Sequence, residues 1–368
     1  MNGLYLHVPF CSALCPYCDF AVVVGRAGEH ERYCDALVAE AEAVAFDGPV
    51  GTVFIGGGTP SLIEPGLLAR TIDKLRGIVG WADDAEMTME ANPESLDSDG
   101  LRALRDAGVN RVSIGAQSFR AHVLRGLGRT HDVSQIGDAA RAARAAGIDN
   151  LNLDLIYGGP GETTGDWRAS LEAAIGLEPE HLSCYALTIE PRTAFGTAVE
   201  RGSMRAPDDD ASAQRFELAC DLLGTAGYEH YEISNWSKRG QACAHNLVYW
   251  TQGDYLGLGL GAHSHRTGHR WWNTRRLRDY LADPATARAG SETLNDAQRA
   301  DEWLELRLRL LEQMDLAEAR AHTGRDLAPV ARALEADGLA VVTEGRVRLT
   351  ISGMLLENEV ALRFLSKP

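Results

Sequence analysis

Six short runs of apolar and β-branched residues recur through the first half of the chain. They cover residues 4–8, 52–58, 87–93, 111–118, 151–160 and 182–188. The segments between them have the alanine-rich composition of helices, as in residues 33–45 and 138–148. Repeated alternation of strand and helix is typical of a parallel sheet, because parallel strands need a long crossover. The pattern predicts an α/β fold, either a partial barrel of six βα units or a doubly wound sheet.

Polar or glycine residues follow these runs, and their positions help to choose between the two folds. They are Cys11, residues 56–59, Glu90, Gln117 and Asp154. Ligands of parallel α/β folds bind at the carboxyl ends of the strands. One site assembled from five successive strand ends suits a barrel better than a single crevice. We therefore expect a partial (β/α)6 barrel.

The strand–helix alternation stops at about residue 200. Residues 201–290 hold the acidic run 208–210, many aromatic residues and the glycine-rich stretch GLGLGAHS at 257–264. We interpret this part as an extension that covers the open side of a barrel formed by residues 1–200.

Residues 291–368 have a third pattern. Residues 299–313 and 326–340 have the 3.6-residue periodicity of amphipathic helices, the second ending near Gly338. Two β-like runs around Glu-Gly then predict a hairpin within residues 341–350. Helices followed by a small hairpin predict a winged-helix-like module.

The charge balance limits the partners of this chain. With 36 Lys and Arg against 52 Asp and Glu, the net charge is −16. An acidic surface argues against broad binding of nucleic acid, so we expect the C-terminal module to pack or to bind a protein rather than to regulate DNA. No apolar stretch reaches the 18 residues of a membrane helix, and the N-terminus lacks a signal-peptide pattern. We expect a cytoplasmic protein whose cysteines stay reduced.

Three of the seven cysteines lie within the eight residues CSALCPYC, as Cys11, Cys15 and Cys18. Thiolate is the soft ligand that iron–sulfur clusters and zinc require. Three cysteines would hold a [4Fe–4S] cluster with one iron left open. A zinc site would need a fourth ligand, for which His7 is the nearest candidate. The isolated cysteines Cys34, Cys184, Cys220 and Cys243 are typical of packing residues.

The motif CSALCPYC, with its flanks YLHVPFC and DF, resembles the signature of the radical S-adenosylmethionine (SAM) superfamily. Within it, the chain is similar to the anaerobic coproporphyrinogen III oxidase family, and there to the haem chaperone branch. The resemblance covers nearly the whole chain and implies a radical SAM barrel, a [4Fe–4S] cluster on the three cysteines, and SAM on the open iron. The oxidase has a further cysteine two residues after the third, where this chain has Phe20, which speaks against oxidase activity.

The resemblance also implies which residues contact SAM. They are Tyr5, Gly57, Gly58, Thr59, Glu90, Gln117, Arg129 and Asp154. Their chemistry is suitable, because glycine allows close backbone approach, carboxylates accept from an ammonium group or ribose hydroxyls, and a guanidinium grips a carboxylate. Asp154 lies in an apolar run, where an unpaired carboxylate would be costly.

A second motif, CAHNLVYW at residues 243–250, resembles the His-Asn-x-x-Tyr-Trp motif of the haem chaperone branch. It makes His245 a candidate axial ligand of haem, with His263, His265 and Cys243 as rivals. From the residues alone, a hydrogen-bonded histidine beside packed aromatic residues is the better explanation of the stretch.

We therefore predict a haem chaperone that binds haem and transfers it to an acceptor protein, with a cluster and SAM in support and an electron donor as a further partner. The alternatives are an oxygen-independent coproporphyrinogen III oxidase, favoured by the shared SAM residues, and a radical methyltransferase that opens haem, for which no substrate-specific feature is recognisable. No catalytic residue is assigned.

Overall fold

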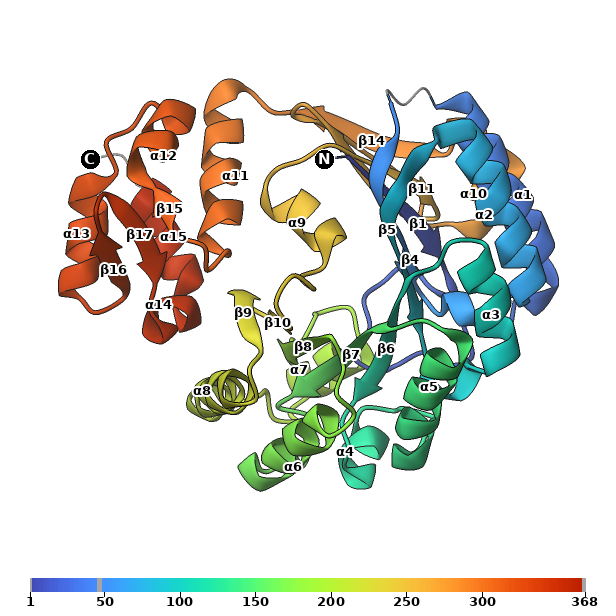
Figure 1. Ribbon diagram of the computed structural model, residues 1–368, viewed down its shortest axis with the longest axis horizontal. Coiled ribbons are helices and arrows are strands. Elements are labelled where there is room, and N and C mark those ends of the chain that lie inside the picture. Colours follow the sequence, from blue (N-terminus) through green and yellow to red (C-terminus); the bar gives the residue numbers. More distant parts are fainter. Residues whose placement is uncertain (1, 45–47, 366–368) are drawn as a thin grey trace.

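A twelve-stranded sheet forms the centre of the computed structural model, which describes residues 2–44 and 48–365. The strand order is β14-β13-β12-β11-β1-β4-β5-β6-β7-β8-β10-β9. The sheet curves, helices cover its outer face, and the C-terminal helices form a group of their own at one side (Figure 1). Some predicted segments include residues outside the described ranges. These are Met1 and residues 45–47 of the predicted barrel unit, of which residue 45 ends the first predicted helix, and residues 366–368 of the predicted C-terminal module.

Six neighbouring strands of this sheet run parallel and confirm the six predicted runs. They are β1 (Gly3–Val8), β4 (Val50–Gly57), β5 (Trp81–Ala91), β6 (Arg111–Gln117), β7 (Asn150–Tyr157) and β8 (His181–Ala186). The strand order follows the sequence without a reversal, so a partial barrel rather than a doubly wound sheet is confirmed.

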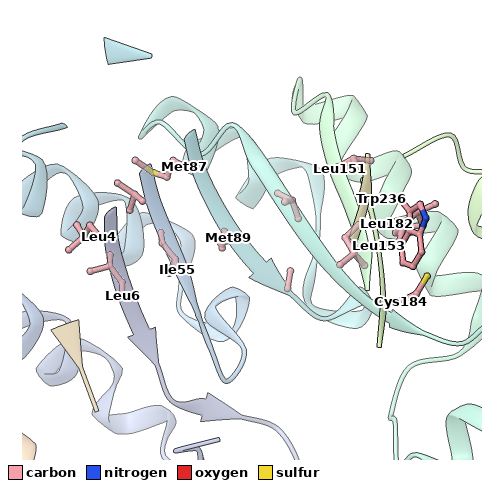
Figure 2. Packing of buried hydrophobic residues seen from close by; sticks show 14 of the residues in the cluster. Leu4, Leu6, Ile55, Met87, Met89, Leu151, Leu153, Leu182, Cys184 and Trp236 are labelled. Carbon is pink, nitrogen blue, oxygen red and sulfur yellow. The ribbon is translucent and has the colours of Figure 1, made fainter. Parts of the chain in front are cut away.

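Alternation along these strands separates an apolar face from a polar one. Figure 2 shows Leu4, Leu6, Ile55, Met87 and Met89 together in the packed layer under the helices. The residues between them point to the inside of the barrel and include many that are polar or aromatic. They are Tyr5, Phe54, Thr88, Glu90, Arg111, Ser113, Asn152, Asp154, His181 and Ser183.

The first six α-helices of the described chain connect the parallel strands, and two more follow β8. They are α1 (His30–Ala43), α2 (Pro65–Val79), α3 (Ser98–Asp106), α4 (Ala121–Gly126), α5 (Val133–Ala146), α6 (Thr164–Ile175), α7 (Ala194–Glu200) and α8 (Asp209–Thr225). Helix α5 begins five residues before the predicted start at 138, because the Asp132 side chain accepts from the backbone N–H groups of Ser134 and Gln135 in a capping box.

Residues beyond β8 extend the sheet at both edges. Strands β9 (Glu229–Glu232) and β10 (Asn235–Ser237) join β8, whereas β11 (Tyr255–Gly259), β12 (His263–Arg266), β13 (His269–Asn273) and β14 (Arg288–Thr293) join β1. The predicted glycine loop is in fact mostly strand β11 and its tight turn. A Cβ on Gly257 would lie 2.0 Å from the backbone oxygen of His263, so only glycine allows this turn.

Two helices lie outside this pattern. Helix α9 (Ala244–Trp250) carries the predicted haem motif and packs against β4 and α11, and α10 (Leu277–Ala282) packs against α1. Because His245 of α9 contacts Thr52 near the start of β4, α9 lies near the amino-terminal ends of the barrel strands. The cysteines lie at the opposite, carboxyl-terminal ends.

The C-terminal part confirms the winged-helix-like module. It contains α11 (Asp296–Leu308), β15 (Met314–Asp315), α12 (Leu316–Thr323), α13 (Ala328–Ala336), β16 (Ala340–Thr343), β17 (Arg346–Leu349), α14 (Ile351–Leu355) and α15 (Glu357–Leu365). Strands β16 and β17 form the predicted hairpin, in which Glu344 and Gly345 both have positive φ angles, as a two-residue hairpin turn requires.

No helix within residues 2–44 and 48–365 is long and apolar enough to cross a membrane.

Candidate active site at the carboxyl ends of the barrel strands

The three clustered cysteines face one cavity of about 570 Å3 at the carboxyl ends of the strands. Cys11 ends the short strand β2 (Phe10–Cys11), which pairs with β3 (Val23–Val24). The chain between them turns back on itself, with the backbone N–H of Cys18 donating to the carbonyl of Cys15 at 3.1 Å. All three side chains are partly exposed and none is in a disulfide.

Two of the thiols receive hydrogen bonds from residues in other loops of the barrel. Thr59 Oγ1 lies 3.8 Å from Cys11 Sγ, and Arg129 Nη1 lies 3.6 Å from Cys15 Sγ. Burial raises the pKa of the Cys11 thiol, and the Thr59 hydrogen bond and the charge of Arg129 oppose that effect. Three thiols, two of which have donors directed at the sulfur, fit a cluster ligated by thiolates, because such donors stabilise negative sulfur.

The zinc alternative finds little support in this geometry. Both ring nitrogens of His7 are engaged, Nδ1 with the Tyr5 hydroxyl at 3.0 Å and Nε2 with the Ala21 carbonyl at 2.9 Å. Over the described residues, no group of three or more His, Cys, Asp or Glu side chains is arranged around a point where a single metal ion could bind. In a [4Fe–4S] cluster each cysteine binds a different iron, so the thiols need not converge on one point.

Asn92 connects the two hydrogen-bonded thiols, and sequence analysis missed it. Its Oδ1 accepts from Arg129 Nη2 at 2.5 Å, and its Nδ2 donates to Thr59 Oγ1 at 3.2 Å. A continuous chain therefore runs from Cys15 through Arg129, Asn92 and Thr59 to Cys11. The signal was available, because Asn92 belongs to the same short stretch, MEANP, as Glu90.

Seven of the eight residues predicted to contact SAM line the cavity that holds the cysteines. They are Gly57, Gly58, Thr59, Glu90, Gln117, Arg129 and Asp154. Gly57 has φ +109°, and a Cβ there would lie 2.4 Å from the His7 ring. The chain therefore needs glycine at this position, which also leaves its backbone open toward the cavity.

Two carboxyl groups lie on the polar wall of this cavity. Glu90 Oε2 accepts from the backbone N–H of Gly57 at 2.9 Å. Burial and the charge of Asp154 raise the pKa of Glu90 to about 7. Asp154 accepts from Ser113 Oγ at 2.7 Å and from Asn152 Nδ2 at 2.8 Å, which satisfies a carboxylate in an otherwise apolar strand.

Tyr5 lies apart from these seven residues. It faces an inner cavity of about 170 Å3, deeper in the barrel, rather than the cavity that holds the cysteines. The two cavities share Glu90, Ser113, Asp154 and Tyr185. The carboxyl groups thus separate an outer chamber that holds the thiols from an inner one.

The amino-acid sequence of the whole chain is similar to those of known proteins. The chain is 42% identical over 373 residues to the haem chaperone HemW of Mycobacterium tuberculosis, which covers 99% of this chain and 94% of that protein. It is 40% identical to HemW of Escherichia coli, covering 88% of this chain and 86% of that protein. The chain belongs to the HemW family. The model of the radical SAM superfamily matches residues 5–174, and that of the HemN C-terminal domain matches residues 294–356.

A solved structure agrees with this assignment of the fold. The coproporphyrinogen III oxidase HemN of Escherichia coli, described as a radical SAM enzyme, superposes with a TM-score of 0.85 at 25% identity. The match covers 99% of this chain and 89% of HemN. The partial barrel, its extensions and the C-terminal module of this HemW-family chain therefore share one arrangement with HemN.

His245, the predicted haem ligand of this HemW-family chain, is fully buried in the inner chamber. Its Nδ1 pairs with Thr52 Oγ1 at 2.9 Å and its Nε2 with the Tyr249 hydroxyl at 2.8 Å. Burial, with a smaller effect of the Arg111 charge, lowers the pKa of His245 to about 3, so the ring is neutral. Neither nitrogen is available to iron in this conformation.

The three rivals of His245 have different surroundings. His265 is buried, with Nδ1 paired to the Gly253 carbonyl at 3.0 Å and Nε2 accepting from the Gly268 N–H at 3.0 Å. Cys243 is buried, with Sγ 3.4 Å from Glu86 Oε1. His263 is exposed and stacks on Trp272, with ring centroids 5.7 Å apart.

The inner chamber contains further polar residues that sequence analysis did not identify. His181 pairs with Asn152 Oδ1 at 2.6 Å and with the Tyr231 hydroxyl at 2.8 Å, which links β7, β8 and β9. Arg111 is fully buried beside them, and its Nε has no hydrogen-bond partner. The signal was a polar residue at every second position of β6, β7 and β8, which indicates a polar barrel interior.

Proposed function

We propose that this chain binds haem and transfers it to an acceptor protein, with a [4Fe–4S] cluster and SAM in its outer chamber. The observation that carries the proposal is that three thiols and a polar wall face one cavity in a chain that matches HemW proteins along nearly its full length. The relatives are named haem chaperones. The thiols of this cavity suit a [4Fe–4S] cluster, and its polar wall suits SAM.

In this proposal the cluster is held by Cys11, Cys15 and Cys18. When bound, a cluster with one open iron supplies a place for SAM to chelate and a source of an electron. The chain itself orients the ligands. Arg129 is placed for the carboxylate of SAM, and Glu90 for its ammonium group. Gly57, Gly58 and Thr59 offer backbone close to the methionine part, and Gln117 and Asp154 offer polar groups to the ribose.

Tyr5 and His245 take different places in this proposal. Tyr5 would support the SAM site from the inner chamber, through the wall that contains Glu90. His245 remains a candidate haem ligand, provided that its hydrogen bonds to Thr52 and Tyr249 open. That step would uncover a buried ring and leave two polar groups without partners, at a cost of about 1–3 kcal/mol for each.

The remaining parts of the proposal concern organisation and partners. We propose a barrel unit of residues 1–200, a covering extension of residues 201–290 and a C-terminal unit of residues 291–368 that packs or binds a protein. The net charge of −16 argues against nucleic acid as a partner. A haem-accepting protein and an electron donor are the expected partners, and the cytoplasm is the expected compartment.

A second candidate is oxygen-independent coproporphyrinogen III oxidase, the activity named for HemN. The TM-score of 0.85 over nearly the whole chain favours it. Phe20 opposes it, because the oxidase family has a cysteine at that position.

One experiment separates these functions. The cluster is reconstituted anaerobically, SAM and a reductant are added, and haem and coproporphyrinogen III are supplied together. Mass spectrometry of the tetrapyrroles should return both unchanged, with haem eluting with the protein. Loss of carboxyl groups from coproporphyrinogen would establish the oxidase instead. Opening or methylation of the haem ring would establish that the protein is a radical methyltransferase.

A further inference from the structure

The outer chamber has an apolar rim in addition to its polar wall. Phe20 is 71% exposed, Leu14 is 63% exposed and Tyr185 is 40% exposed, and all three line the cavity. A single exposed apolar side chain is normal on a protein surface, whereas several around one cavity mark an interaction site. Three of them around one cavity indicate a site for an apolar ligand.

The lining of the cavity combines polar and apolar side chains. The polar part holds Glu90, Asn92, Gln117, Arg129 and Asp154, and it suits a small charged ligand. Further apolar residues also line the cavity. These are Ala13, Val22, Ile156, Ala186 and Leu187. The ammonium and carboxylate groups of SAM suit the polar residues, and its adenine ring suits part of the apolar lining.

A cation lies next to this rim. Arg275, in the segment after β13, donates from Nη2 to the backbone carbonyl of Asp19, and its guanidinium is 4.0 Å from the Asp19 carboxylate. Its side chain is 54% exposed, so donors remain open to solvent beside Phe20. An exposed guanidinium can grip a further carboxylate through paired hydrogen bonds.

We propose that haem docks on the apolar rim formed by Leu14, Phe20 and Tyr185, with a propionate directed to Arg275. The inference rests on the proposed function and assigns a place to its ligand. Haem combines a flat apolar ring with two carboxylates at one edge, which matches a rim of exposed apolar side chains next to an arginine. The ring then covers surface that is otherwise wet, and the cluster and SAM occupy the polar part beneath it.

The rim satisfies one condition that the His245 site does not. Its side chains are accessible without a conformational change, whereas His245 is fully buried with both nitrogens paired.

The test compares haem affinities of full-length, anaerobically reconstituted variants by absorbance titration. The rim variant is Leu14→Ser with Phe20→Ser, and Phe20→Leu is its conservative counterpart. Leu356→Ser is the matched control, because Leu356 is 50% exposed but lies in the C-terminal module. Iron and sulfide content and calorimetric SAM binding are measured on every variant.

The rim variant is expected to bind haem at least about tenfold more weakly, because two apolar side chains no longer cover the ring. Phe20→Leu and Leu356→Ser should stay within about threefold of the parent, and Arg275→Gln should weaken haem binding but not SAM binding. Unchanged haem affinity of the rim variant, or loss of SAM binding in place of haem binding, overturns the rim assignment while the haem chaperone role stands. Failure of the parent protein to bind haem overturns the proposed function itself.

Discussion

Asn92 holds Arg129 through a hydrogen bond of 2.5 Å from Arg129 Nη2 to Asn92 Oδ1, and this contact positions the guanidinium beside the Cys15 thiol. The amide of Asn92 donates in turn to Thr59, which lies next to Cys11. One side chain therefore fixes the donors of two cysteines, although it touches neither of them.

Two substitutions of Asn92 distinguish its contact with Arg129 from its contact with Thr59. Asn92→Ala should lower SAM affinity about tenfold, because Arg129 loses the acceptor that orients it. Asn92→Asp keeps an acceptor for Arg129 and should retain SAM affinity within about threefold. Both variants should bind a full complement of iron and sulfide, since all three cysteines remain. Calorimetry with SAM checks the difference, and equal affinities of Asn92→Ala and the parent would refute the positioning role.

Each cluster cysteine should be essential for the cluster but not for the fold. Cys11→Ala, Cys15→Ala and Cys18→Ala remove one of three ligands from a partly exposed loop, so cluster content after reconstitution should fall below about a tenth of the parent's. Thermal unfolding of the cluster-free proteins should hardly change. Cys220→Ala, a partly exposed cysteine on α8, is the control and should bind a full cluster. A variant of the trio that kept its cluster would show that the ligand set is different.

His245 should matter for stability more than for haem. His245→Ala removes a buried ring and leaves Thr52 and Tyr249 without their partner, so the free energy of unfolding should fall by about 2–4 kcal/mol. His263→Ala, at an exposed position, should cost less than about 1 kcal/mol. Denaturant unfolding measures both values. Haem affinity of the folded His245→Ala protein should stay within about twofold, and a loss of tenfold or more would restore His245 as the ligand.

The strands and the cysteine loop could be predicted from sequence, because both are local patterns. Leu4 and Leu6 alternate with neighbours that face the inside of the barrel. Cys11, Cys15 and Cys18 lie within one stretch of eight residues. What escaped prediction depends on contacts between distant residues. Strand β11 lies beside β1 although about 250 residues separate them, and no periodicity encodes that pairing. His245 illustrates the same limit, since its motif does not reveal that α9 directs the ring into the barrel toward Thr52.

Glu40 should make stability depend on pH. It is buried and accepts from Gly259, Asn273 and Tyr280, yet burial raises its pKa from 4.5 to about 7. The folded protein therefore holds a proton that the unfolded chain releases near pH 4.5. The resulting stabilisation is complete below pH 4.5 and is lost as the pH rises through 7.

The variant Glu40→Gln cannot titrate, so its free energy of unfolding should fall less steeply between pH 4.5 and 7 than that of the parent. The difference in slope should integrate to the order of 1–3 kcal/mol. Denaturant unfolding at several pH values checks this, and parallel curves for the Glu40 variant and the parent would contradict it.

Glu90 should couple SAM binding to pH. Its pKa of about 7 means that it is mostly protonated at pH 6, when it cannot accept fully from the SAM ammonium group. Between pH 6 and 7 the carboxylate form of Glu90 increases from about a tenth to about a half, so SAM affinity should rise roughly fivefold, while most of an α-amino group with a pKa near 7.7–8 keeps its proton. Glu90→Gln should bind SAM weakly and with little pH dependence. Asp154→Asn removes the charge that helps to raise the pKa, and it should move the rise in affinity to lower pH. Calorimetry on the reconstituted protein across this window measures all three, and a Glu90→Gln profile that follows the parent's would mean that another group responds to pH.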